Sequence, residues 1–163
     1  MKKTILWILV IGWALMIFMF SAQPAKESDE VSLSIGAQII KIVVSMKIID
    51  IPVSSDGDVQ IEIWAEQINH FIRKAAHFTI FLILGVLVFL LLRCYKDFKI
   101  SFILTLAICL LYATSDEIHQ LAVPGRAGQI KDVLLDFSGS FLGVILISII
   151  EKLFEKYKIK NNK

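Results

Sequence analysis

The sequence predicts an all-α fold, a polytopic membrane bundle of four transmembrane helices with amphipathic helices in the first extracellular segment. Two observations support this prediction. The 163 residues are 56% hydrophobic and only 20% charged, whereas soluble domains carry about 25% charged residues. Four apolar runs, at about residues 5–20, 75–92, 100–115 and 133–150, approach the roughly 20 residues that a helix needs to cross a bilayer. We therefore expect residues 1–163 to form a single membrane domain.

The first run, residues 5–20, is uninterrupted and follows Lys2 and Lys3. A cleaved signal peptide begins in the same way. The run is long for that role, however, and neither Met19 nor Phe20 is the small residue that a cleavage site needs. We therefore predict a retained membrane anchor.

Residues 28–73 are too long for a simple connection and predict a helical cap at the outer membrane interface. A first amphipathic stretch has its expected start at Ser28, and a second runs from about Val59 into the second span. Pro52 and the cluster at residues 54–58 separate the two stretches. A small soluble extracellular hairpin remains the alternative, because periodicity alone does not exclude it.

The three later runs differ in length and polarity. The run at 75–92 is almost free of polar residues, and the run at 133–150 carries Asp136 near its start. The run at 100–115 is the shortest and by length alone could be a buried helix of a soluble protein. We count it as a span because four spans keep both termini on one side of the membrane.

Charge asymmetry sets the orientation, since basic residues concentrate on the cytoplasmic side. Cytoplasmic termini bring together the N-terminal lysines, the loop between the second and third spans, and the C-terminal tail. These basic residues are Lys2, Lys3, Arg93, Lys96, Lys99, Lys152, Lys156, Lys158, Lys160 and Lys163. The polar motifs then gather at the outer ends of the spans.

The entry to the second span carries Arg73, Lys74 and His77. Arg73 and His77 are four residues apart and share one helix face. All three side chains could simply contact headgroups or backbone carbonyls, and for Lys74 we prefer that interpretation. For Arg73 and His77 we favour a functional role, because polar groups at this depth usually pair or serve a site.

The end of the third span carries Asp116, Glu117, His119 and Gln120. On a continuing helix Asp116 and Gln120 share one face. Such a group can bind a cation, act as acid or base, or pair with the basic residues of the second span. A solvated helix end would account for His119. It accounts less well for the acidic pair, because negative charge at a helix C-terminus opposes the macrodipole.

A turn follows, in which Pro124 presets one backbone dihedral and Gly125 accepts a positive φ. This turn is expected to direct Arg126 back over the bundle. An arginine there suits bidentate recognition of phosphate or carboxylate. A simple contact with a lipid headgroup is the equal alternative.

The fourth span brings Asp132 and Asp136 one helical turn apart, above Gly139 and Gly143. The two glycines form a GxxxG pair, which permits close approach of helices. We therefore expect this face to pack inward, with its carboxylates in a polar cavity. For Asp136, which lies within the apolar run, we favour function over simple ion pairing.

The sequence predicts no metal site, although the donors that would suit one are present. No HExxH or comparable ligand spacing appears, so a metal is left open, and so is any other cofactor. The formal net charge of +2 is small and dispersed, which excludes nucleic acid as a partner. The available donors are His77, Asp116, Glu117, His119, Asp132 and Asp136.

Five motifs in order, from the first span to Gly143, resemble the VanZ-like family of membrane proteins. They are Phe20-Ser21-Ala22-Gln23-Pro24, Arg73-Lys74-Ala75-Ala76-His77-Phe78, Ser115-Asp116-Glu117-Ile118-His119-Gln120, Val123-Pro124-Gly125-Arg126, and Asp132-Val133 with Asp136 and Gly139. One departure is Ala122, where the family pattern leads us to expect an aromatic residue. Family members are small bacterial multi-span proteins, and the name-giving member is associated with low-level resistance to the glycopeptide antibiotic teicoplanin. The resemblance implies a role in the bacterial cell envelope, without a mechanism.

We therefore expect an outer-leaflet site that binds or modifies an anionic envelope lipid or glycopeptide and contributes to teicoplanin resistance. Its partners would be membrane lipids or lipid-linked envelope precursors. A membrane-embedded hydrolase or transferase, or a subunit of a transport complex, is the alternative. Catalysis and oligomeric state stay open, with His77, Asp116, Glu117 and Asp136 as catalytic candidates. The expected ligand-binding residues are Arg73, Lys74, His77, Asp116, Glu117, Gln120, Arg126, Asp132 and Asp136.

Overall fold

The computed structural model describes residues 2–46 and 57–161 of the chain. This part forms five helices and contains no strand: α1 (Lys2–Ser21), α2 (Ala25–Ser45), α3 (Gly57–Arg93), α4 (Phe98–Gln120) and α5 (Ile130–Asn161). Within them, four stretches are long and apolar enough to cross a membrane: Lys2–Ser21, Ile63–Arg93, Phe98–Gln120 and Ile130–Lys158. The predicted all-α fold with four spans is confirmed.

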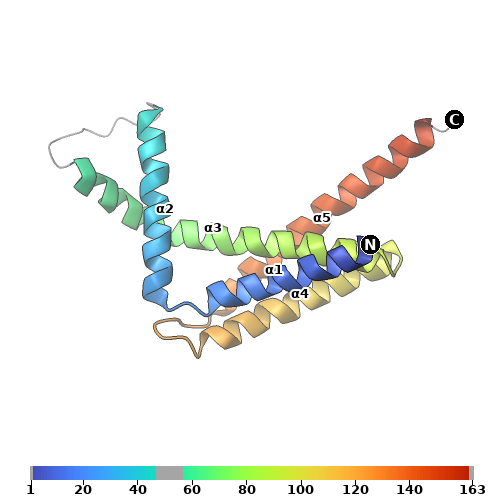
Figure 1. Cartoon of the computed structure of the whole chain (residues 1–163), viewed down its shortest axis with the longest axis horizontal. Coiled ribbons are helices and arrows are strands. Elements are labelled where there is room, and N and C mark those ends of the chain that lie inside the picture. The colour runs from blue at the N-terminus through green and yellow to red at the C-terminus, as the bar shows by residue number, and fades with distance from the viewer. Residues whose placement is uncertain (1, 47–56, 162–163) are drawn as a thin grey trace.

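Helix α3 is the centre of the bundle and packs against each of the other helices. In Figure 1, α1, α3 and α4 run side by side, and the second half of α5 diverges from them. The N-terminus lies beside the turn between α3 and α4, where Trp7 Nε1 donates a hydrogen bond of 3.2 Å to the hydroxyl of Tyr95. The turns at residues 22–24 and 121–129 lie at the opposite end.

Helix α2 stands across the bundle axis and packs on the beginning of α3 (Figure 1). Its buried face consists of Ser32, Gly36 and Ile40. The predicted helix is confirmed, and its apolar residues Val31, Ile35 and Ile39 are exposed. The predicted start at Ser28 is wrong, because the helix begins at Ala25. Pro24 has φ −53° there, which suits helix entry, and the amide of Ser28 already donates to the carbonyl of Pro24 at 3.2 Å.

The second amphipathic stretch and the second span form one continuous helix, α3. The sequence predicted that the second stretch continues directly into the span, and this prediction is confirmed. Most of the predicted break between the two amphipathic stretches, at Pro52 and residues 54–58, lies outside the described residues, and its last two residues, Gly57 and Asp58, already belong to α3. The cap and the bundle are therefore joined through one continuous helix, α3.

Glycines allow α3 and α5 to approach closely. A Cβ on Gly139 would collide with the carbonyl of Phe78, and one on Gly143 with the carbonyl of Leu82. Ser140 Oγ also donates to the carbonyl of Phe81 at 3.0 Å. The predicted GxxxG packing is confirmed, and this seam sets the register in which the polar end of α3 meets α5.

Candidate functional site

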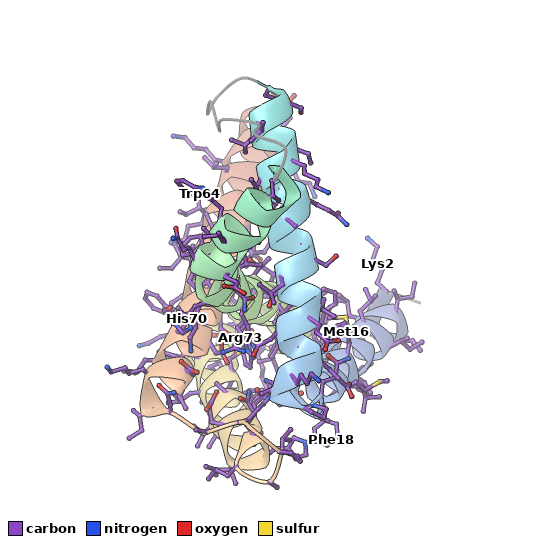
Figure 2. All side chains as sticks on the ribbon, turned by 90° about the vertical axis from the view of Figure 1, so that its left-hand side faces the viewer. Lys2, Met16, Phe18, Trp64, His70 and Arg73 are labelled. Atoms are coloured by element: carbon purple, nitrogen blue, oxygen red, sulfur yellow. The ribbon has the colours of Figure 1, made fainter. Side chains whose placement is uncertain are left out.

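The polar motifs meet at the end of the bundle opposite the N-terminus. Figure 2 looks onto this end, with His70 and Arg73 of α3 near the centre of the view. Residues from α3, α4 and α5 and from the 121–129 turn contribute side chains to it. The site is therefore built by several segments that lie far apart in the sequence.

Arg126 is directed back over the bundle, as the sequence predicted. Gly125 has a φ of +76°, the left-handed conformation that the turn requires. The Nε of Arg126 donates to the carbonyl of Gln23 at 2.9 Å, and Nη2 donates to that of Phe20 at 3.3 Å. A cation is favourable at these positions because they form the C-terminal end of α1.

Arg126 is half-buried, and charged side chains of both signs lie near it. Burial lowers the pKa of its guanidinium, and the nearby positive charge of Arg73 lowers it further. The charges of Asp116, Glu117 and Asp29 oppose this effect. Two arginines thus lie close enough to repel each other, and an anion between them would relieve that repulsion.

Two ion pairs fasten α3 to its neighbours at this end. Arg73 Nη1 pairs with Asp29 of α2, an acidic partner that the sequence analysis did not single out. Lys74 Nζ pairs with Asp132 of α5, so it contacts the bundle and does not simply extend to headgroups. The acidic partner of Lys74 lies in the first turn of α5, where negative charge is favourable.

His77 and Asp136 face each other across α3 and α5. His77 Nδ1 lies 3.6 Å from Asp136 Oδ2. The Asp136 side chain is 1% exposed, and neither of its oxygens has a hydrogen-bond partner within the described part of the chain. Asp116 approaches the pair from α4, so that one donor atom from each of the three residues lies within 4.8 Å of the others.

Asp116 and Gln120 share one face of α4, as predicted, and Gln120 Nε2 donates to Asp116 Oδ2 at 3.0 Å. Glu117 has a different role, because its Oε2 accepts a hydrogen bond of 2.8 Å from the amide of Gln129. Its buried Oε1 has no partner among the described residues. Glu117 thus ties the loop before α5 to α4.

A polar cavity of about 190 Å³ lies between these groups. Most of the predicted ligand-binding residues line it, although Asp116 and Glu117 do not. His70 and Gln129 were missed by the sequence analysis. His70 could have been found, because it precedes His77 by two helical turns, whereas nothing in the sequence marks Gln129. The lining residues are Ala25, His70, Arg73, Lys74, His77, Gln120, Gly125, Arg126, Ala127, Gln129, Asp132, Leu135 and Asp136.

A second, mainly apolar cavity of about 230 Å³ adjoins the first. The two cavities share Arg73, His77 and Arg126. His119 lines neither of them, and its ring stacks on Phe18 at 4.4 Å between centroids. The apolar cavity is lined by Phe20, Gln23, Ser28, Val31, Ser32, Ile35, Ile72, Arg73, Ala76, His77, Ile80 and Arg126.

A family model described as VanZ/LLP1 matches residues 6–151. The chain belongs to this family. The match spans α1 to α5 and includes every residue of the two cavities, and it confirms the resemblance carried by the polar motifs. The VanZ/LLP1 family and the four apolar helices together identify a multi-pass membrane protein, linked by family to glycopeptide resistance. Comparisons with curated proteins and with solved structures gave no match.

Proposed function

We propose that this VanZ/LLP1 protein binds an anionic amphiphile of the bacterial envelope, a lipid or a lipid-linked glycopeptide precursor, and that binding contributes to teicoplanin resistance. One observation carries the proposal. A polar and an apolar cavity adjoin each other and share Arg73, His77 and Arg126. A ligand with a charged head and an apolar tail matches both cavities at once.

The polar cavity suits a phosphate or carboxylate headgroup. Arg73, Lys74 and Arg126 bring three positive charges to its wall. Arginine binds such groups through two parallel N–H donors. An anion between Arg73 and Arg126 would also offset the mutual repulsion that lowers the pKa of Arg126.

The apolar cavity suits a hydrocarbon chain. Its wall includes Phe20, Val31 and Ile35, whose side chains are exposed on the outside of the bundle. An exposed apolar wall beside a membrane-spanning bundle is open to the lipid phase. The tail of a bilayer lipid can therefore reach this cavity without leaving the membrane.

The site belongs on the outer side of the membrane under the proposed orientation. Lys2, Lys3, Lys96 and Lys99 lie toward the other end of the bundle. Basic residues are enriched in cytoplasmic loops. The cavities would then face the leaflet from which glycopeptides approach.

The first test compares resistance in a sensitive Gram-positive host. Wild type and the variants Arg73→Ala, Glu117→Ala, Arg126→Ala and Asp136→Ala are expressed, and teicoplanin susceptibility is measured together with the membrane level of the protein. We expect wild type to protect and the four variants to lose protection at unchanged protein level. Arg93→Ala is the matched control, because it removes an arginine of α3 that pairs with Glu151 at the opposite end.

Three results would contradict the proposal. If wild type confers no protection, the resistance role does not extend to this protein. If wild type protects and all four variants match it, the site is elsewhere. Loss of protection in Arg93→Ala as well would indicate a general defect of the bundle and would count against a specific site.

A further inference from the structure

We propose that His77, Asp116 and Asp136 form a binding site for a divalent transition-metal cation, for which Zn²⁺ is the best match. The three residues come from α3, α4 and α5, and their donor atoms lie within 4.8 Å of one another. Their positions in the sequence follow no metal-binding spacing. Only the packing of three helices brings them together.

The buried carboxyl groups of this site favour a bound cation. Asp136 is 1% exposed, and both of its oxygens lack a hydrogen-bond partner among the described residues. A buried carboxylate is strongly unfavourable unless it is paired or coordinates a metal. Asp116 adds a second buried carboxyl group, and one divalent ion would neutralise the two negative charges of the ionised pair.

The neighbouring cations are engaged elsewhere. Lys74 pairs with Asp132, and Arg126 donates to the backbone carbonyls at the end of α1. Within the described residues, Asp136 has His77 as its ion-pair partner. An imidazole supplies at most one positive charge and is itself a common metal ligand.

The distance between His77 and Asp136 fits shared coordination better than a hydrogen bond. Nδ1 and Oδ2 are 3.6 Å apart, beyond the usual length of an N–H···O bond. Two ligands that hold Zn²⁺ at about 2.1 Å in a tetrahedral arrangement lie about 3.4 Å from each other. His77 and Asp136 therefore need to close only slightly around an ion, whereas Asp116 must move closer from within 4.8 Å.

The donors and their surroundings also fit zinc. One imidazole and two carboxylates form a mixed nitrogen and oxygen set, which suits Zn²⁺ better than Mg²⁺ or Ca²⁺. Gln120 holds Asp116 by a hydrogen bond of 3.0 Å, as residues behind metal ligands commonly do. His77 and Asp136 also line the polar cavity, which gives a bound ion access to water or to a ligand oxygen.

The test uses the full-length protein, purified in detergent and treated with a chelator. Zn²⁺, Mn²⁺, Mg²⁺ or Ca²⁺ is then added, and bound metal and thermal unfolding are measured. We expect about one Zn²⁺ per chain and a rise in the unfolding temperature with Zn²⁺. Asp136→Asn, Asp116→Asn and His77→Gln should each bind Zn²⁺ at least tenfold more weakly. Gln120→Ala should weaken binding by roughly tenfold, because Gln120 only orients a ligand.

His70→Gln is the matched control, because it removes an imidazole that lines the same cavity but lies outside the three-residue group. It should bind Zn²⁺ as wild type does. The proposal is overturned if wild type binds no stoichiometric metal and its unfolding temperature does not respond to any of the four ions. It is equally overturned if His70→Gln loses the metal as Asp136→Asn does. The measurement needs no amphiphile, so its result is independent of the proposed function.

Discussion

At the scale of single residues, the site is organised by charges that already have partners. Arg73 pairs with Asp29, Lys74 with Asp132, and Arg126 with the carbonyls of α1. An incoming anion must therefore exchange with an internal partner before it contacts a cation. The least buried of these partners is Asp29, whose side chain is 41% exposed, and it is the easiest to displace.

Replacing Asp29 should consequently strengthen anion binding. In Asp29→Asn the guanidinium of Arg73 is released, and we expect a roughly two- to fivefold gain in affinity for phosphatidylglycerol, because partly exposed ion pairs are worth about 1 kcal/mol or less. Native mass spectrometry of the purified protein with phosphatidylglycerol or phosphatidylcholine measures the change. Glu30→Gln removes the same charge from an exposed position of α2 and should have no effect. Equal binding by Asp29→Asn and wild type would show that Arg73 does not contact the anion.

At the scale of helices, the seam between α3 and α5 decides whether the site forms. Gly139 and Gly143 place α5 directly against backbone carbonyls of α3. His77 directly precedes Phe78 on α3, and Asp136 lies about one turn before Gly139 on α5. Any widening of the seam therefore separates His77 from Asp136 as well.

A methyl group in the seam should destabilise the protein. Gly143→Ala would place Cβ against the carbonyl of Leu82, and we expect a loss of about 1–3 kcal/mol in the free energy of unfolding. Gly12→Ala in α1 is the matched control, because nothing lies within 4 Å of the added atom. It should change stability by about 1 kcal/mol or less, in the favourable direction. Thermal unfolding in detergent compares the two, and equal stability of both variants would contradict close packing at Gly143.

Contacts within and between helices differ in how far the sequence predicts them. Contacts within one helix or turn follow from spacing, so the pairing of Asp116 with Gln120 and the positive φ of Gly125 were predictable. Contacts between helices depend on register and crossing angle, which spacing does not encode. The pairs of Arg73 with Asp29 and of Lys74 with Asp132 were missed for that reason. The start of α2 was misplaced because Ser28 is a good helix cap in isolation, whereas Pro24 already sets the backbone for helix entry.

At the scale of the whole molecule, the two ends of the bundle differ in character. One end carries lysines around the N-terminus and the turn between α3 and α4, and the other holds the cavities. Helix α2 presents an exposed apolar stripe that includes Val31, Ile35 and Ile39. Since α2 lies across the bundle at the cavity end (Figure 1), we expect this stripe to rest on the membrane interface.

The orientation can be measured by labelling single cysteines in intact cells. After Cys94 and Cys109 are replaced, a membrane-impermeant maleimide should label Ala127→Cys, an exposed position beside the polar cavity. Lys96→Cys, exposed at the opposite end, should react only after the cells are permeabilised. The reverse pattern would put the cavities in the cytoplasm and contradict the proposed encounter with teicoplanin.

The hydrogen bonds between Arg126 and the end of α1 join segments that the ribosome makes far apart in time. The carbonyl of Gln23 is synthesised 103 residues before the guanidinium that satisfies it. Until then the last turn of α1 must bond with water or headgroups. Asp136 emerges later still, on the final helix. A nascent chain that stalls before α5 therefore has three membrane helices and a cap, but lacks the side of the polar cavity that Asp132 and Asp136 form.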